Sequence, residues 1–121
     1  MVASRVGTLD ETINRLEAGL GLSSEELASA LAASPQDIER WVVGESRPNA
    51  ETQRRLDALL ALDEHLHETF RPGGIPGWLR APNRYIGSIT KRQTTPIEAI
   101  VRGEFDWVEG ALVVIDYGMF V

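Results

Sequence analysis

The sequence predicts an all-α protein, and three features of its pattern support this. Residues that commonly cap helix N-termini recur along the chain, apolar residues follow each of them at helical spacing, and glycines stand where helices are expected to end. Strand-like alternation is absent apart from the ambiguous stretch ALVVIDY (111–117), which the spacing from Phe105 assigns to a helix. A chain of 121 residues has room for one domain, or for two very small ones that share a core.

The first two helices are expected to begin with a capping box, in which a Ser or Thr and a Glu three residues later satisfy two exposed backbone N–H groups. Thr8 with Glu11 fits the start of the first helix and Ser23 with Glu26 that of the second, with Gly21 between them as a stop signal. The expected apolar faces consist of Leu9, Ile13, Leu16 and Leu20 in the first helix, and of Leu27 and Leu31 in the second.

The third and fourth helices have simpler start signals. Ser34 offers a capping hydroxyl before Pro35, whose missing N–H costs nothing in a first helical turn. Gly44 stands where this helix should stop, and Asn49 is the expected cap of the next one. The expected apolar faces consist of Ile38, Trp41 and Val42 in the third helix, and of Leu56, Leu59, Leu60, Leu66 and Phe70 in the fourth.

The segment RPGGIPG (71–77) contains two prolines and three glycines and is predicted to separate two parts of the chain. The first part, residues 1–71, holds the four helices above, and the second part is residues 72–121. The second part begins with a short helical turn and irregular chain in the stretch GWLRAPNRYIG.

Two further helices are expected in the second part. Thr95-Pro96 starts one of them and Gly103 ends it. The last helix runs from about Phe105, and Gly118 fits its C-terminal cap.

Composition and charge exclude several classes of protein. Cysteine is absent, which rules out disulfides, thiolate metal sites and Cys nucleophiles. No signal peptide or membrane-spanning run is recognisable, so a cytoplasmic protein is expected. The net charge of −6 is uneven: the first 70 residues carry six arginines and thirteen acidic residues, a net −7, and the remainder carries +1. The first part is therefore a poor generic binder of polyanions, because phosphate attraction follows local positive charge.

Residues 22–48 have the pattern of a helix-turn-helix unit, with two short helices joined by a tight turn near Ala33-Ser34. The first 70 or so residues resemble the Xre/Cro-type domain, whose second helix enters the major groove of DNA. The matching positions are Leu27, Ala28, Leu31, Ser34, Ile38, Trp41, Gly44 and Pro48.

DNA binding by this unit is left open by the sequence. The candidate DNA-binding residues are Gln36 and Arg40, which can pair with base edges, and Arg47, Arg54 and Arg55, which can hold phosphates. Asp37 and Glu39 lie beside the base-reading candidates and repel the phosphate backbone. One module contacts too few base pairs for specific binding, so dimer geometry would be needed.

No catalytic residue, metal site or cofactor is predicted. The only histidines, His65 and His67, are two residues apart on a helix, so they cannot chelate one metal together and are interpreted as surface polar residues beside the leucine stripe. The carboxylate pairs Glu25-Glu26 and Asp63-Glu64 are interpreted as solvated helix surface. The serines lack the neighbouring base of a nucleophile, and the PGGIPG glycines lack the lysine of a phosphate loop.

The second part resembles the toxin-binding domain of the Xre/MbcA/ParS antitoxin family. The resemblance rests on the order W-L-x-x-P-N, T-P, G-E and G-x-x-V, over about 45 residues that reach the last one. The segment SITKRQT (88–94) departs from the family pattern, since it is longer than the usual turn before Thr-Pro. The matching positions are Trp78, Leu79, Pro82, Asn83, Ile86, Gly87, Pro96, Glu98, Ile100, Gly103, Glu104, Val108, Leu112, Gly118 and Val121.

The resemblance implies an antitoxin of a type II toxin–antitoxin system that holds a RES-domain, NAD⁺-consuming toxin inactive, with the antitoxin C-terminus at or near the toxin's NAD⁺ site. Most of the matching positions are explained by packing alone. The predicted toxin-binding residues are Asn83, Arg84, Tyr85, Gly118, Met119, Phe120 and Val121. The apolar triplet 119–121 is expected to dock in a cleft of the toxin and to bring a terminal carboxylate there; the alternative is that it covers the protein's own core.

Two other functions remain open at this point. One is a stand-alone helix-turn-helix transcriptional regulator, against which the acidic first part argues. The other is an antitoxin-like adaptor for a different partner. The expected assembly is a homodimer within a toxin–antitoxin hetero-oligomer, with operator DNA as a further candidate partner through the first part and with no membrane contact.

Overall fold

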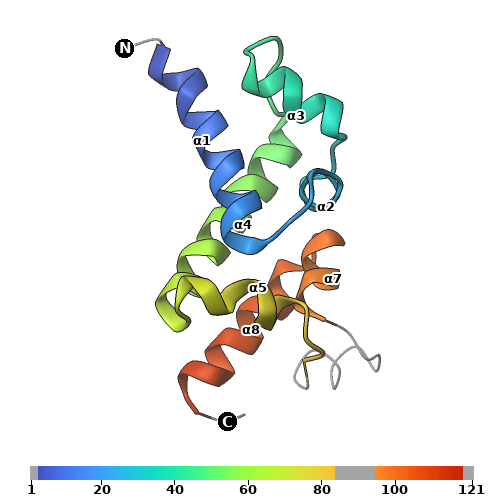
Figure 1. The fold of residues 1–121 in the computed structure, drawn as a ribbon. Coiled ribbons are helices and arrows are strands. Elements are labelled where there is room, and N and C mark those ends of the chain that lie inside the picture. Colours follow the sequence, from blue (N-terminus) through green and yellow to red (C-terminus); the bar gives the residue numbers. More distant parts are fainter. Residues whose placement is uncertain (1–2, 84–94, 119–121) are drawn as a thin grey trace.

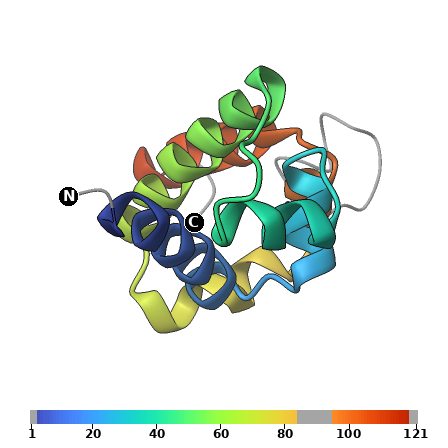
Figure 2. The ribbon, with the colours of Figure 1, turned by 90° about the horizontal axis from the view of Figure 1, so that it is seen from above.

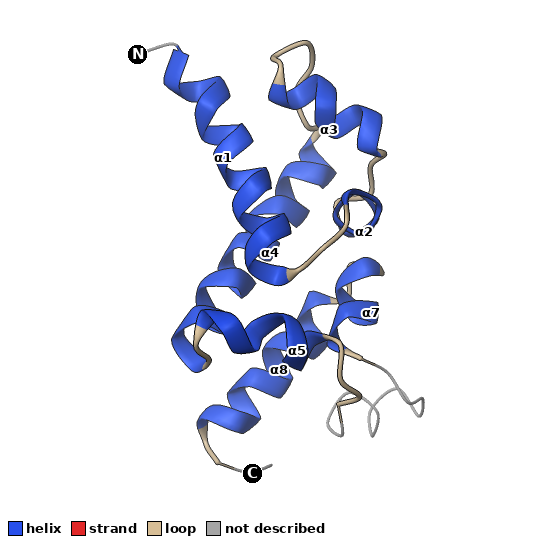
Figure 3. Cartoon of the chain, viewed as in Figure 1, coloured by secondary structure: helices blue, strands red, loops and turns tan. Residues whose placement is uncertain are grey.

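The computed structural model confirms the all-α prediction over the residues that it describes, 3–83 and 95–118, with side chains described from residue 9 (Figure 1; Figure 3). These ranges contain helices, turns and no strand. The elements are α1 (Ala3–Leu20), α2 (Ser24–Ala30), α3 (Pro35–Val42), α4 (Ala50–Thr69), the 3₁₀ turn η1 (Pro72–Gly74), α5 (Ile75–Leu79), α7 (Pro96–Val101) and α8 (Phe105–Asp116).

Four of the predicted helix starts are confirmed by hydrogen bonds. Ser23 and Ser34 each form a complete capping box, in which the side chain accepts from the backbone N–H three residues on, and Glu26 or Asp37 accepts from the cap's own N–H. The Asn49 side chain accepts from the backbone N–H of Thr52 at 2.8 Å. Thr95 caps α7 in the same way.

The capping role predicted for Thr8 is wrong, because α1 begins at Ala3 and Thr8 lies inside it. Residues 3–7 contain no proline, and the single Gly7 costs only about 1 kcal/mol relative to alanine in a helix interior. A favourable local cap at Thr8 therefore does not stop the helix from extending toward the N-terminus.

The RPGGIPG segment is more regular than its composition suggests. It forms η1 and the first turn of α5, with Pro76 in the first turn, where a missing N–H is harmless. Gly21 ends α1 with a φ of +71°, and a Cβ built there would lie 3.1 Å from the Cβ of Pro76. The end of α1 thus needs glycine both for its backbone conformation and for the close approach of α5.

One continuous apolar core runs through both predicted parts. The longest helix, α4, makes its most extensive contact with α8, while α7 packs on α2 and α5 packs on α1 (Figure 1; Figure 2). The division at residues 71 and 72 therefore crosses a shared core and stays a prediction. The largest fully buried side chains are Leu16, Leu20, Leu27, Leu31, Leu59, Leu62, Leu66, Ile75, Leu79, Ile100 and Leu112.

Candidate functional site

The C-terminal end of α8 presents apolar side chains to solvent. Val113 is 44% exposed and Tyr117 is 78% exposed, and the two are four residues apart on the same side of the helix. Val43, at the far end of α3, is the third large apolar side chain that is exposed among the described residues. Gly118 follows with a φ of +72°, the left-handed conformation that ends the helix as predicted.

Two of the seven predicted toxin-binding residues are described. Asn83 is partly buried after α5, and Gly118 is exposed after α8. The other five, Arg84, Tyr85, Met119, Phe120 and Val121, lie outside the described residues. Val113 and Tyr117 were missed as candidates, although the signal was present: an aromatic residue four positions after a valine, next to the acidic end of a helix.

The end of α8 is attached to α4 by a polar cluster. His65 of α4 lies between two carboxylates of α8: its Nδ1 contacts Oε1 of Glu109, and its Nε2 lies 2.7 Å from Oδ2 of Asp116. Thr69, one turn further along α4, donates its hydroxyl to the other oxygen of Asp116 at 3.0 Å. The interpretation of His65 as a surface polar residue is therefore wrong; only about 20% of its side chain is exposed.

The protonation of this cluster follows from its geometry. Burial alone would lower the pKa of His65, but hydrogen bonds and charge from Asp116 and Glu109 outweigh it and raise that pKa above the ordinary value of 6.5. The hydrogen bond from His65, followed by that from Thr69, lowers the pKa of Asp116. Histidine and aspartate therefore favour each other's charged forms.

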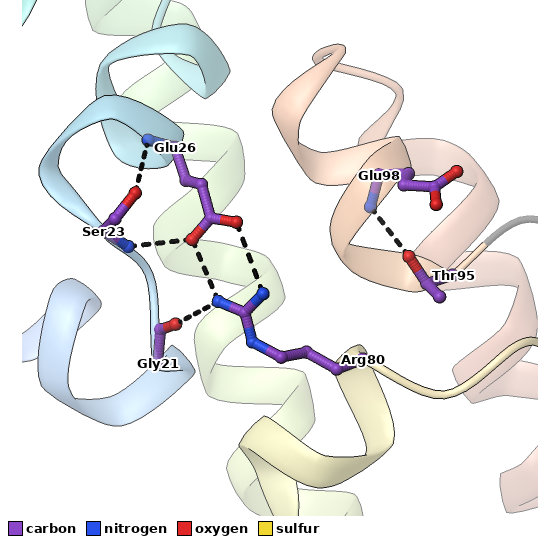
Figure 4. Close-up of polar contacts among 6 residues, drawn as sticks. All are labelled: Gly21, Ser23, Glu26, Arg80, Thr95 and Glu98. Atoms are coloured by element: carbon purple, nitrogen blue, oxygen red, sulfur yellow. Dashed lines mark hydrogen bonds and ion pairs between the residues drawn. The ribbon is translucent and has the colours of Figure 1, made fainter.

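Arg80 attaches the chain before Asn83 to the first part of the protein. Figure 4 shows its guanidinium reaching the carboxylate of Glu26, with Nη2 2.9 Å from Oε1, and donating to the carbonyl oxygen of Gly21 at 2.6 Å. The pKa of Glu26 is lowered by the hydrogen bond from Arg80 and then by that from the backbone of Ser23. Glu26 thus belongs to a contact between elements, which corrects its interpretation as solvated surface.

Asp63 was also predicted to be solvated surface, and it is fully buried. Its Oδ2 accepts from both Nε and Nη2 of Arg15, at 3.1 and 2.9 Å, so α1 and α4 are joined by an ion pair. The other oxygen lies 3.2 Å from Nε2 of His67, without hydrogen-bond geometry.

An open hollow between α1 and α4, lined by Arg15 and His67 together with Glu64, adjoins this cluster. Among the described residues, no group of three His or acidic side chains could hold a metal.

The candidate DNA-binding residues lie on α3 and near the start of α4. Gln36, Arg40 and Arg47 are exposed. Arg40 lies 3.3 Å from Asp37, and both Arg54 and Arg55 pair with Glu51 one turn before them. These carboxylates reduce the positive potential that a phosphate would encounter.

Arg55 also has a structural position that the sequence did not indicate. Its Nη1 donates to the carbonyl oxygen of Ala30 at 3.4 Å. A Cβ built at Gly103 would lie 2.3 Å from the same nitrogen, so the guanidinium packs directly on this glycine between α7 and α8. The side chain therefore spans the end of α2, the start of α4 and the turn after α7.

None of the described helices is long and apolar enough to cross a membrane. No family model matches the chain. It is 27% identical over 116 residues to the mycobacterial cidal antitoxin MbcA of Mycobacterium bovis and of Mycobacterium tuberculosis, which covers 96% of this chain and 98% of each relative. Its fold matches a chain in the crystal structure of the M. tuberculosis MbcT–MbcA toxin–antitoxin complex with a TM-score of 0.66, at 27% identity and with 96% of both chains covered. The protein is therefore a homologue of the MbcA antitoxins over nearly its whole length and has the same all-helical fold.

Proposed function

We propose that this protein is the antitoxin of a type II toxin–antitoxin pair and that it inhibits a RES-domain, NAD⁺-consuming toxin by covering the toxin's active site. The observation that carries the proposal is the exposed pair Val113 and Tyr117 at the end of α8, directly before residues 119–121. The homology of the protein to the MbcA antitoxins supports its assignment to the general class of antitoxins. The protein acts in the cytoplasm as a binding protein, without catalysis, metal or cofactor of its own.

The chemistry of this surface suits protein recognition. Burial of one such side chain in a partner's cleft contributes about 1.5–3 kcal/mol, and tyrosine is enriched at interface centres because it offers a large apolar ring with a polar tip. Gly118 allows the chain to leave the axis of α8. The proposal assigns residues 119–121 to the same interface. Asn83, Arg84 and Tyr85 supply a polar rim in this proposal.

A second function, repression of its own operon, is supported by the helix pair α2–α3 with its exposed Gln36 and Arg40. Figure 1 places α3 and the last turn of α8 at opposite ends of the molecule, so a toxin at one end leaves the other free for DNA. The acidic first part and the paired arginines favour weak binding by one copy, which a homodimer within the toxin–antitoxin assembly would strengthen. A stand-alone regulator would instead bind its operator tightly without a toxin.

The experiment is a titration of NAD⁺ consumption by a RES-domain protein, to be sought in the reading frames adjacent to this one. Wild-type protein is expected to abolish the activity at stoichiometric concentration, and Tyr117→Asp is expected to raise the concentration needed by at least about tenfold, since a buried unpaired charge is costly. Val43→Asp is the matched control, because it places the same charge on an exposed apolar residue directly after α3. Inhibition by Tyr117→Asp equal to that by wild type, or none by wild type, would overturn the proposal.

A further inference from the structure

The ring of His65 requires a positive charge where it lies. Each of its two nitrogens faces a carboxylate oxygen, on Glu109 and on Asp116. A carboxylate only accepts hydrogen bonds, and a neutral imidazole has a single N–H to donate. Both contacts form together only when the ring is an imidazolium.

The two carboxylates are seven residues apart on α8, which is two helical turns, and they face α4 from the same side. His65 therefore holds both ends of the final two turns of α8, and Thr69 adds a second contact to Asp116. Among the described residues, the charged groups in contact with His65 are these two carboxylates of α8, the helix packed against this part of α4.

The last turn of α8 contains an unfavourable negative charge that the helix itself does not balance. Asp116 is its final residue, where the partial negative charge of the helix C-terminus disfavours a carboxylate, and the turn contains no basic residue. The compensating positive charge comes from α4. The ordered end of α8 thus depends on a residue 51 positions away in the sequence.

We propose that His65 is a positioning residue for toxin binding: its imidazolium holds the last two turns of α8 on α4, so that Val113 and Tyr117 are held where the toxin contacts them. This role rests on the proposed function. The same role makes the affinity for the toxin sensitive to pH near neutrality, because histidine is the residue whose charge changes there.

The direction of the pH effect follows from the raised pKa of His65. The stabilisation is complete below the ordinary histidine pKa of 6.5 and is lost as the pH rises through the higher pKa of the folded protein. Asp116 remains charged throughout this range, because its pKa is lowered further from an ordinary value that is already acidic. The end of α8 is therefore held more firmly on α4 at pH 6 than at clearly alkaline pH.

The first experiment measures amide hydrogen exchange in α8 of the free protein at pH 6.0 and pH 8.5, corrected for intrinsic exchange rates. Protection of residues 112–118 is expected to fall by roughly fivefold between the two pH values, the lower end of the usual range for coupled groups, because the ring loses the charge that both carboxylates contact. In His65→Gln it should be low at both. His67→Gln is the matched control, since His67 lies on the same helix but faces Asp63. Equal protection in wild type at both pH values, or full protection in His65→Gln at pH 6.0, would overturn the proposal.

The second experiment measures toxin affinity of the same proteins, compared at each pH so that any titration of the toxin cancels. His65→Gln is expected to bind about five- to tenfold more weakly than wild type at pH 6.0 and about equally at pH 8.5. A ratio that is the same at both pH values would overturn the positioning role even if wild type inhibits well. If wild type binds no RES-domain toxin at either pH, the proposed function fails, and with it the role in toxin binding, whereas the exchange result still decides whether His65 holds α8.

Discussion

Arg80 and Glu26 form an ion pair across 54 residues of sequence, with Nη2 of the arginine 2.9 Å from Oε1 of the glutamate (Figure 4). The same carboxylate accepts the backbone N–H of Ser23 and completes the capping box of α2. One side chain thus secures both the start of α2 and the chain that leads from α5 to Asn83. The two roles are coupled, because the cap orients the carboxylate that Arg80 binds.

Glu26→Ala is expected to lower the free energy of unfolding by about 1–2 kcal/mol, since it removes a helix cap and a partly buried ion pair together. Chemical denaturation measures this. Glu25→Ala, at the exposed neighbouring residue, is the control and should change little. The pKa of Glu26 is lowered in the folded protein, so its contribution is present at neutral pH and lost as the pH falls through that pKa. The difference between the two variants should therefore shrink as the pH is lowered; a difference that stays constant from neutral pH into acid would contradict this account.

Replacement of Asp63 by alanine should destabilise the protein by about 1–3 kcal/mol, because the buried carboxylate satisfies two hydrogen bonds from Arg15. The neighbouring exposed residue provides the control, Glu64→Ala, which should remain within about 0.5 kcal/mol of wild type. Thermal and urea unfolding would both report the difference. Equal stability of the two variants would show that the α1–α4 ion pair contributes nothing net.

Ala32 is the only non-glycine residue with a positive φ among those described, at 58°, in the turn between α2 and α3. The left-handed conformation costs an L-residue roughly 1–2 kcal/mol, and glycine avoids that cost. Ala32→Gly is expected to raise the free energy of unfolding by about 0.5–1 kcal/mol, the strain relief less the extra chain entropy. Ala33→Gly, at a position without positive φ, should be neutral or destabilising. A destabilised Ala32→Gly would refute the strain.

Deletion of residues 119–121 separates a docking role of this triplet from a role in the core. A docking segment can be removed with almost no change in melting temperature, yet inhibition of the toxin's NAD⁺ consumption should become poor, since the apolar contact is lost. Differential scanning calorimetry and the NAD⁺ assay on one preparation give both values. Loss of folding on deletion would instead assign the triplet to the protein's own core, and intact inhibition would remove it from the interface.

DNA binding by the free protein is expected to be weak and strongly dependent on salt, because the first 70 residues carry a net charge of −7 and three of the four candidate arginines have carboxylate partners. Gel-shift titrations on the region upstream of the reading frame should show tighter binding by the toxin complex. Arg47 has no such partner among the described residues, so Arg47→Ala should reduce the salt slope by about one, unlike Arg102→Ala at the end of α7. Tight binding by the free protein, insensitive to salt, would favour the stand-alone regulator.

The helix starts at Ser23, Ser34, Asn49 and Thr95 could be predicted because each rests on a hydrogen bond to a residue only three positions away. The prediction that the first helix begins at Thr8 was wrong because a favourable cap within the sequence does not prevent a helix from starting earlier. The burial of Asp63 could not be read from an acidic pair in sequence. It required the knowledge that Arg15, 48 residues earlier, lies opposite it on α1.

The helical class, most helix boundaries and the resemblance to an antitoxin family could be read from the sequence, because capping and apolar spacing act within a few residues and a family motif consists of residue types in a given order. The protonation state of His65 and the exposure of Tyr117 could not be read in this way. Both depend on how α8 lies along α4, since the charged form of His65 is stabilised by two carboxylates 44 and 51 residues away. A histidine's pKa reflects the groups packed around it, and that packing exists only once the chain has folded.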